Sequence, residues 1–270
     1  MTLTGTLTTI SVRGVDVSFY EAGSGPAVLY LHGAATLEGF SFLDALTDDF
    51  QVIAPFHPGY APGQEGRGLL GAQDLTVHYM DFIETLQLDR PHLIGFSMGG
   101  WLAAELAVFY GGRLGGVALI APAGLRTDNI PCTDLGAIAP VDLPSYLAHD
   151  ASIAARYFPG GDAAPAESVF EADRAREAAA QALIEAPVGM GHPNMGRWLH
   201  RIKNPVKVYW GAEDRMVSSA YLHRWAAAIP HADQQMIEKA GHLVMFERPG
   251  MMDDVVDFFW RSGVKAEQLK

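Results

Sequence analysis

Polar and apolar positions alternate with a period of two over residues 8–12 and 15–20, on either side of Arg13-Gly14. This pattern predicts a β-hairpin in which one face of each strand meets water. Later in the chain, short apolar segments are typical of strands that are buried in a sheet. These predicted strands cover residues 27–31, 51–54, 92–95, 116–120 and 206–210, and one more strand is predicted over 234–237.

Between the predicted strands, apolar positions recur at the three- and four-residue spacing of an amphipathic helix. Strands that alternate with helices indicate βαβ units and a mainly parallel sheet. The predicted helices cover residues 37–46, 74–86, 101–110, 219–228 and 251–260, and the glycine- and proline-rich segment 60–71 is predicted as a loop. The inner stripes are predicted to be Leu75, Tyr79, Phe82, Ile83 and Leu86 on one helix, and Leu102, Leu106 and Phe109 on another.

The alternation of strands and helices stops over residues 125–199, which contain no buried strand pattern. Helical segments are predicted there at 144–157, 165–186 and 195–201. We therefore expect a helical cap at 125–199, inserted into a core domain made of residues 1–124 and 200–270. The tail 265–270 is predicted to be frayed.

The chain has 270 residues, of which 49% are hydrophobic, and a net charge of −12. It can bury a large core, and its acidity disfavours nucleic acid or an anionic membrane as a partner. A single cysteine, Cys132, suits a reducing compartment, and the first residues lack a signal-peptide pattern. We expect a cytoplasmic protein with a small-molecule substrate and with neither cofactor nor metal; the sequence leaves a homodimer open.

Composition does not identify a function, but Gly95-x-Ser97-x-Gly99 does suggest one. It lies between the predicted strand 92–95 and the predicted helix 101–110. Such a sharp turn from strand to helix lifts a serine hydroxyl clear of the sheet, and the flanking glycines leave room for a close approach. Ser97 is therefore a candidate nucleophile. The alternative is an inert serine that caps the helix.

A serine hydroxyl needs a base to take its proton and a third group to orient that base. Asp214 follows the strand that ends at Trp210, and His242 follows the strand that ends near Ile237. Ligands bind at the carboxyl ends of strands in such sheets, so these side chains are candidates for the acid and the base. A solvated carboxylate and a surface histidine are the alternatives; rival acids are Glu213 and, less favoured, Asp128 and Asp134.

Two backbone N–H groups are candidates for stabilising a developing oxyanion. Met98 begins the helix after Ser97, where the N–H is unpaired and the helix dipole favours negative charge. Ala34 lies in the loop after the strand 27–31 and could supply the second donor. We expect His32 to hold this loop by hydrogen bonding, without a catalytic role.

Together these motifs resemble α/β-hydrolase-fold serine hydrolases over nearly the whole chain. The resemblance rests on residues 31–33, 95–100, 118–124, 211–214 and 241–242, read as LHG, GFSMGG, ALIAPAG, GAED and GH. It implies a mostly parallel eight-stranded sheet flanked by helices, with a cap. It also implies Ser97 as nucleophile, Asp214 as orienting acid and His242 as base. Where many members have Asp before Pro-Gly, this chain has His57-Pro58-Gly59, which puts a structural contact in doubt; His57 could instead line the pocket mouth.

A serine at this turn argues against relatives that use a carboxylate nucleophile. Hydrolysis of a small to medium-sized, largely apolar ester is the leading interpretation. Carbon–carbon bond hydrolysis of the meta-cleavage-product type is the alternative, and a ligand-binding receptor on the same fold is a third. Candidate pocket residues are Phe40, Tyr146, Trp198 and Leu243, with Phe158, Met190 and Met195; His192, His200 and Arg201 could meet an acidic substrate group or lie on a solvated cap surface.

Overall fold

The computed structural model describes residues 3–36, 40–61, 71–126, 130, 133, 138–139, 141–157, 182 and 191–267. In this part of the chain, eight strands form one sheet in the order β1-β2-β4-β3-β5-β6-β7-β8. Their bounds are Thr6–Val12 (β1), Val15–Ala22 (β2), Ala27–Leu31 (β3), Gln51–Pro55 (β4), His92–Phe96 (β5), Val117–Ile120 (β6), Val206–Gly211 (β7) and Asp233–Ile237 (β8).

The predicted hairpin is confirmed. Strands β1 and β2 pair antiparallel with Val12 opposite Val15, so Arg13 and Gly14 form a two-residue turn. Both turn residues have positive φ, 49° and 86°. This geometry matches the twist of the flanking strands, and glycine adopts it without a steric cost.

The other strands form the mainly parallel sheet that the alternating pattern predicts. Strand β4 pairs antiparallel with β2 and parallel with β3, and the pairs from β3 through β5, β6, β7 and β8 are all parallel. The carboxyl ends of parallel strands meet at one edge of a sheet. The loops after β3, β4, β5, β7 and β8 therefore come together there, and they carry the candidate residues.

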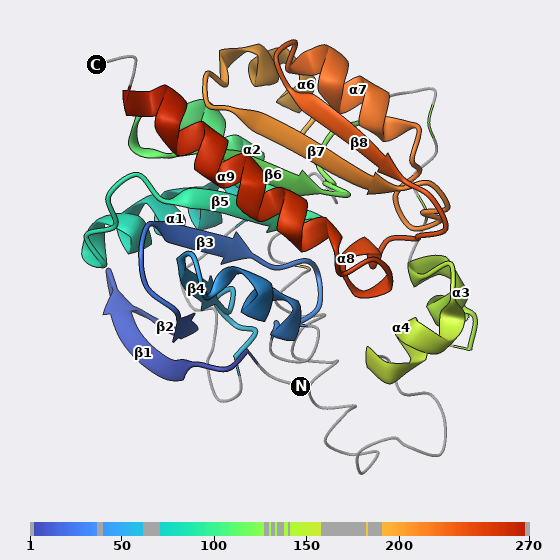
Figure 1. Cartoon of the computed structure of the whole chain (residues 1–270), viewed down its shortest axis with the longest axis horizontal. Coiled ribbons are helices and arrows are strands. Elements are labelled where there is room, and N and C mark those ends of the chain that lie inside the picture. Colours follow the sequence, from blue (N-terminus) through green and yellow to red (C-terminus); the bar gives the residue numbers. More distant parts are fainter. Residues whose placement is uncertain are drawn as a thin grey trace.

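Helices cover both faces of the sheet (Figure 1). Helix α2 (Met98–Tyr110) packs on β3, β5 and β6, and α1 (Ala72–Thr85) packs on α2. Helix α9 (Met251–Glu267) crosses the opposite face, where its Phe259 stacks on His92 with 4.5 Å between ring centroids. Helix α7 (Tyr221–Ala228) packs on β7 and β8. Since neighbouring side chains on a strand point to opposite faces, β5 contacts α9 and α2 through alternate residues.

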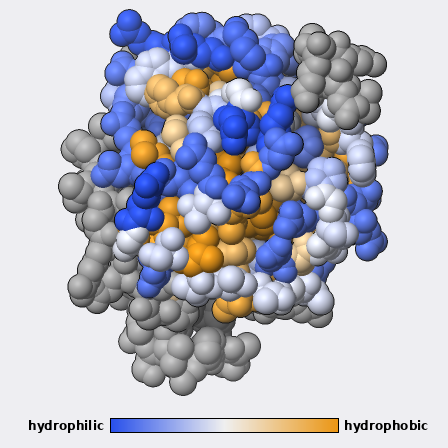
Figure 2. Space-filling model, turned by 90° about the vertical axis from the view of Figure 1, so that its left-hand side faces the viewer, coloured by the Kyte–Doolittle hydropathy of each residue, from blue (hydrophilic) through white to orange (hydrophobic). Residues whose placement is uncertain are grey.

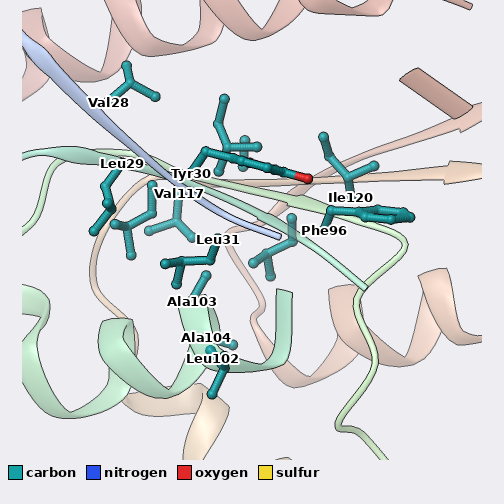
Figure 3. Close-up of a cluster of buried hydrophobic side chains, with 14 of the residues drawn as sticks. Val28, Leu29, Tyr30, Leu31, Phe96, Leu102, Ala103, Ala104, Val117 and Ile120 are labelled. Atoms are coloured by element: carbon teal, nitrogen blue, oxygen red, sulfur yellow. The ribbon is translucent and has the colours of Figure 1, made fainter. Parts of the chain in front are cut away.

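The core fills both spaces between the sheet and its helices. In Figure 3, Leu29 and Leu31 of β3 point toward α2, where Ala103 lies, while Tyr30 and Phe96 point to the other face. All five are buried. Because the central strands are buried on both faces, they show continuous apolar runs in the sequence.

Two of the helices predicted in the first half of the chain differ from expectation. Within 37–46, residues 37–39 lie outside the described residues, and Ser41–Leu46 (η2) is a 3-10 helix. Its buried side chains, Leu43 and Leu46, are three residues apart, which is the repeat of a 3-10 helix. In α2 the predicted buried stripe was too narrow, because residues 98–108 are all buried. The stripe also wrongly included Phe109, which is 54% exposed. A helix enclosed on all sides has no polar face to reveal its period.

The segment 125–199 contains short helices in its described parts. The single helix predicted over 144–157 is two helices, α3 (Leu143–Leu147) and α4 (Ala151–Tyr157), because Ala148 adopts an extended conformation. The helix predicted over 195–201 is α6 (Met195–Trp198) followed by a 3-10 turn, η5 (Leu199–Arg201). The helix predicted over 165–186 lies outside the described residues, and so does most of the loop 60–71.

The end of the chain contains more helix than the sequence pattern predicted. A short helix, α8 (Val244–Glu247), was not predicted, and α9 continues to Glu267, beyond its predicted end at residue 260. Helix α8 has only four residues, too few for a hydrophobic period to show in the sequence.

In the middle of the chain, a short 3-10 turn, η3 (Gly111–Arg113), follows α2.

In the described part of the chain, no helix combines the length and the apolar character that crossing a bilayer requires. The face drawn in Figure 2 shows apolar residues gathered near its middle, with hydrophilic residues around them. Because more than half of an ordinary protein surface is apolar, this gathering by itself does not indicate a binding site.

Candidate active site

Ser97 occupies a strained turn between β5 and α2. Its φ is 52° and its ψ −116°, a combination that residues with a side chain rarely adopt. The turn is held by a hydrogen bond from the Ser97 N–H to the Ile120 carbonyl (3.0 Å). The Ser97 side chain makes no capping hydrogen bond to the helix, so the alternative of an inert helix cap has no support. The predicted turn from strand to helix is confirmed.

The glycines around Ser97 are required by space. A Cβ at Gly95 would lie 2.5 Å from the Gly99 carbonyl oxygen. A Cβ at Gly99 would lie 2.0 Å from the carbonyl oxygen of Leu31 and 2.4 Å from that of His32. The first turn of α2 thus packs directly on the backbone at the end of β3. This contact brings the loop after β3 next to the serine.

Replacing Gly99 by Ala should destabilise the protein by about 3 kcal/mol or more, because the backbone atoms that its Cβ would meet cannot move independently. Chemical denaturation with urea measures the change. Gly112→Ala is the matched control, since a Cβ there meets nothing within 4 Å. Equal stability of the two variants would contradict the close contact between α2 and β3.

Asp214 and His242 form a buried hydrogen-bonded pair. The His242 Nδ1–H donates to Asp214 Oδ2 over 2.8 Å, and the residues are 3% and 6% exposed. Asp214 Oδ1 accepts the N–H groups of Met216 (2.8 Å) and Val217 (2.9 Å). The carboxylate therefore has a backbone-bonded oxygen and an oxygen that orients the imidazole. This leaves His242 Nε2 as the ring nitrogen able to accept a proton.

The rival acid Glu213 has another partner. Its carboxylate pairs with the His149 ring, and both side chains are exposed to about the same extent, 42% and 39%. The other rivals, Asp128 and Asp134, lie outside the described residues. Of the described acids, Asp214 is the one bonded to His242.

Ser97 is close to this pair through its neighbour. The ring of Phe96 lies 4.9 Å from the His242 ring, measured between centroids. Ser97 itself is 8% exposed. Between these two described residues, no hydrogen bond joins Ser97 Oγ to the His242 ring. Hydrogen bonds of this kind are often long without substrate and shorten in its complex.

The candidate oxyanion donors flank Ser97. A Cβ at Gly33 would lie 3.3 Å from the Ser97 Cβ, so the loop after β3 touches the serine. Ala34, the next residue, is partly exposed. Among the described residues, neither the Ala34 N–H nor the Met98 N–H donates a hydrogen bond. Two unpaired N–H groups beside a nucleophile suit the stabilisation of negative charge.

His32 holds this loop as expected, but His57 does not line a pocket mouth. Both histidines are fully buried. The His57 N–H donates to His32 Nε2 (2.8 Å), and the His57 ring bonds the His32 carbonyl through Nε2 (2.8 Å). His32 Nδ1 bonds the Gly33 carbonyl (2.7 Å), and His57 Nδ1 bonds the Tyr79 hydroxyl. The sequence could not show this, because Tyr79 lies 22 residues from His57.

Burial makes several histidines costly to protonate. It lowers the pKa of His92 to about 4, with a smaller contribution from the positive charge of Arg90, and the pKa of His57 to about 3, from an ordinary value of 6.5. The unfolded chain binds these protons below pH 6.5, whereas the folded protein does not. The free energy of unfolding therefore falls as the pH drops from 6.5 toward 4.

Between pH 7 and pH 5, His92 should reduce the free energy of unfolding by about 2 kcal/mol. Urea denaturation of His92→Asn should show a loss smaller by that amount, since Asn keeps an acceptor for the Gly116 N–H that His92 Nδ1 accepts. The exposed His223 is the control, and His223→Asn should lose as much stability as the wild type. Parallel curves for His92→Asn and wild type would contradict the effect of burial.

The candidate pocket residues separate in the structure. Phe40 is fully buried and stacks on His32 (5.7 Å between centroids), so it supports the loop after β3 from behind. Leu243 is also buried, and its N–H donates to the Leu147 carbonyl of α3 (2.9 Å). Tyr146 precedes Leu147 and is partly exposed. Phe40 is thus a packing residue, while Tyr146 and Leu243 lie at the junction of α3 with the His242 loop.

Trp198 lies far from the serine. Its ring packs on Phe109 (5.5 Å) and on His192 (4.4 Å). Phe109 is twelve residues after Ser97 on α2, which is about 18 Å at 1.5 Å per residue. This position favours a packing role and not a pocket role. Met195 is buried, His200 and Arg201 are exposed, and Phe158 and Met190 lie outside the described residues.

Glu247 is a site residue that the sequence analysis missed. This buried carboxylate accepts the N–H of Gly241 through Oε2 (2.6 Å) and the N–H of Asp150 through Oε1 (2.9 Å). It joins the loop that carries His242 to the start of α4. An acidic residue at the end of the apolar run 243–246 was the available signal, because a buried carboxylate needs partners.

Among the described residues, no group of three or more His, Cys, Asp or Glu side chains is arranged to hold a metal ion. The described site therefore offers a buried acid–base pair, a serine in a strained turn and unpaired backbone N–H groups. These are the parts that acyl transfer requires.

The chain belongs to the α/β hydrolase family, whose model matches residues 28–255. Human monoacylglycerol lipase ABHD6 is 24% identical over 84% of this chain and 73% of its own length.

Two solved structures share the fold. The meta-cleavage product hydrolase CumD of Pseudomonas fluorescens IP01 has a TM-score of 0.72 at 20% identity, covering 94% of this chain and 97% of that one. Naproxen esterase (carboxylesterase NP) of Bacillus subtilis has a TM-score of 0.74 at 17% identity, covering 96% and 92%. At these identities, the structural likeness establishes the fold and leaves the reaction open.

Proposed function

We propose that this protein is a serine hydrolase that cleaves a small to medium-sized, largely apolar ester through an acyl-enzyme. The observation that carries the proposal is the buried hydrogen bond between His242 and Asp214, at the sheet edge where Ser97 holds its strained turn. A serine without a role would have no reason to occupy a strained turn. His242 is buried together with its acid, which argues against a solvated surface histidine.

In the first half of the reaction, Ser97 Oγ attacks the ester carbonyl and His242 Nε2 takes its proton. Asp214 Oδ2 keeps the proton on Nδ1, so the ring presents the correct nitrogen and its positive charge is stabilised. The carbonyl oxygen becomes an oxyanion, which the N–H groups of Met98 and Ala34 stabilise. The bond to the alcohol then breaks, and His242 gives its proton to the leaving alkoxide.

In the second half, a water molecule attacks the acyl-enzyme and gives its proton to His242. The second tetrahedral intermediate uses the same two N–H groups. When it collapses, the bond to Ser97 Oγ breaks, His242 returns the proton to the serine, and the carboxylic acid leaves. No cofactor takes part in either half.

The place where the substrate binds is proposed from the contact between α3 and the loop that carries His242. We infer that residues 125–199 form a cap over the core 1–124 and 200–270, with Tyr146 and Leu243 near the acyl group. The human lipase relative and the esterase of the same fold act on esters by name, which supports an ester substrate. The single cysteine supports a reducing, cytoplasmic setting.

The second candidate function is hydrolysis of a carbon–carbon bond. The likeness to a meta-cleavage product hydrolase, with a TM-score close to that of the esterase, favours considering it. The same three side chains would serve that reaction, so the two candidates differ in the substrate that is turned over.

The proposal is tested by turnover of p-nitrophenyl acetate, butyrate and octanoate beside a dienoic diketone of the meta-cleavage type. We expect a p-nitrophenyl ester to be cleaved with a much higher kcat/KM than the diketone. Turnover of the diketone with negligible ester cleavage would establish the second candidate instead. No turnover of either substrate would leave a ligand-binding role.

A further inference from the structure

The loops after β3 and β4 are joined by two reciprocal hydrogen bonds between His32 and His57. The backbone N–H of His57 donates to the His32 ring, and the His57 ring bonds the His32 carbonyl. Both distances are 2.8 Å, and the ring centroids are 3.7 Å apart. Each histidine thus holds the other's backbone. The two loops therefore cannot move apart without breaking both buried hydrogen bonds.

The backbone groups fix the proton on every ring nitrogen. The His57 N–H can only donate, so His32 Nε2 accepts, and a neutral His32 then donates from Nδ1 to the Gly33 carbonyl. The His32 carbonyl can only accept, so His57 Nε2 donates and its Nδ1 accepts the Tyr79 hydroxyl. The four ring nitrogens are all satisfied. The Tyr79 hydroxyl of α1 thus donates to the His57 ring, and the His57 ring donates to the His32 carbonyl.

We propose that His57 is a positioning residue for the oxyanion donor at Ala34, acting through the backbone of His32 and Gly33. This inference rests on the proposed function, since it assigns His57 to the same site. The chemistry is specific: a neutral imidazole that donates to a carbonyl from one nitrogen and accepts a tyrosine hydroxyl at the other.

The position of His57 supports this role. The His32 and Gly33 carbonyls are both held by imidazole N–H groups, and Ala34 is the next residue after Gly33. The same His32 carbonyl lies 2.4 Å from where a Cβ on Gly99 would be, so the loop has α2 on its other side. With both sides of the loop held, the Ala34 N–H keeps one direction relative to Ser97.

Burial keeps both histidines of the network in their neutral form at neutral pH. It lowers the pKa of His32 well below its usual value, with a further contribution from His57, and the pKa of His57 to about 3. Neither ring gains a proton at neutral pH, so its donors and acceptors stay in place. The network therefore acts as a fixed support and takes no proton from the reaction.

Two substitutions of His57 separate the roles of its two ring nitrogens. In His57→Gln, the side-chain NH₂ can reach the His32 carbonyl in place of Nε2–H. In His57→Asn, the shorter side chain can still accept the Tyr79 hydroxyl in place of Nδ1, but it does not reach that carbonyl. Tyr79→Phe removes the hydroxyl and leaves His57 without its outer partner. His92→Asn is the control, because His92 is a buried histidine at the start of β5, where it stacks on Phe259 of α9.

For hydrolysis of p-nitrophenyl butyrate, we expect His57→Asn to lower kcat about 10- to 100-fold while KM changes less than about threefold. Displacing an oxyanion donor weakens binding of the transition state and not of the substrate, and complete loss of such a donor costs about 10²–10³ in kcat. His57→Gln should recover most of the rate, Tyr79→Phe should fall between, and His92→Asn should match the wild type. Affinity for an alkyl trifluoromethyl ketone, which resembles the tetrahedral intermediate, should fall in parallel with kcat.

A measurement that needs no turnover separates this proposal from the function it rests on. In amide NMR spectra of the folded variants, the Gly33 and Ala34 resonances should move in His57→Asn and Tyr79→Phe, and stay in place in His92→Asn. If the wild type cleaves no ester and these resonances still move, the proposed function fails while the support of the loop stands. A kcat of folded His57→Asn within twofold of the wild type, or unmoved Gly33 and Ala34 resonances, would overturn the proposal.

Discussion

Replacing Ser97 by Ala should lower kcat for a p-nitrophenyl ester by roughly 10⁴- to 10⁶-fold. The residual rate comes from binding and the oxyanion donors alone, as is usual when a triad loses its nucleophile. Steady-state kinetics with a burst-phase measurement checks it, because the wild type should release one equivalent of p-nitrophenol quickly and the variant none.

The matched control for this prediction is Ser262→Ala. Ser262 is another buried serine, 4% exposed against 8% for Ser97, and its hydroxyl bonds the Phe258 carbonyl within α9. Its replacement should leave kcat within about twofold. A folded Ser97→Ala variant that keeps more than a tenth of the wild-type kcat would exclude Ser97 as the nucleophile.

Replacing Asp214 by Asn should lower kcat by roughly 10³- to 10⁴-fold. Met216 and Val217 donate their N–H groups to Asp214 Oδ1, so the amide oxygen of Asn must stay there. The amide NH₂ would then face His242 Nδ1 and convert that nitrogen to an acceptor. The proton would move to Nε2, and the imidazole could no longer take the Ser97 proton. Kinetics at saturating ester across pH 6–9 measures the loss.

Glu213→Gln is the internal control for the acid, since Glu213 is the adjacent carboxylate and pairs with His149. It should change kcat less than about threefold, because the pair is exposed to solvent. The opposite pattern, a severe loss in Glu213→Gln and a mild one in Asp214→Asn, would transfer the role of orienting acid to Glu213.

The sequence was most informative where a local pattern repeats. Apolar runs located the five strands β3 to β7, and the Arg13-Gly14 turn located β1 and β2, because strand burial and turn geometry depend on neighbouring residues. Strand β8 was also predicted, although its residues are largely polar and none is fully buried. The turn at Ser97 could be predicted for the same reason. The pairing of Asp214 with His242 could be predicted from topology, since parallel strands end at one edge.

The sequence was least informative where a contact joins distant segments. Phe40 looked like a pocket residue, yet it packs behind His32, and Trp198 packs on Phe109 far along α2. Neither the loop residue Phe40 nor Trp198, at the end of the four-residue helix α6, lies in a segment long enough for the sequence to show which way its side chain faces. Glu247 was missed because its partners include Asp150, 97 residues away. Such contacts depend on tertiary packing and leave no local period.

The most direct test of the account is the site of covalent labelling by a fluorophosphonate. Such a probe reacts with a serine that a neighbouring base has activated, and peptide mass spectrometry locates the adduct. The account predicts a single adduct on Ser97 in the wild type, with labelling at least about 1,000-fold slower in His242→Ala, which lacks the activating base. An ester-cleaving wild type that carries no adduct on Ser97, or carries it on another residue, would contradict the account.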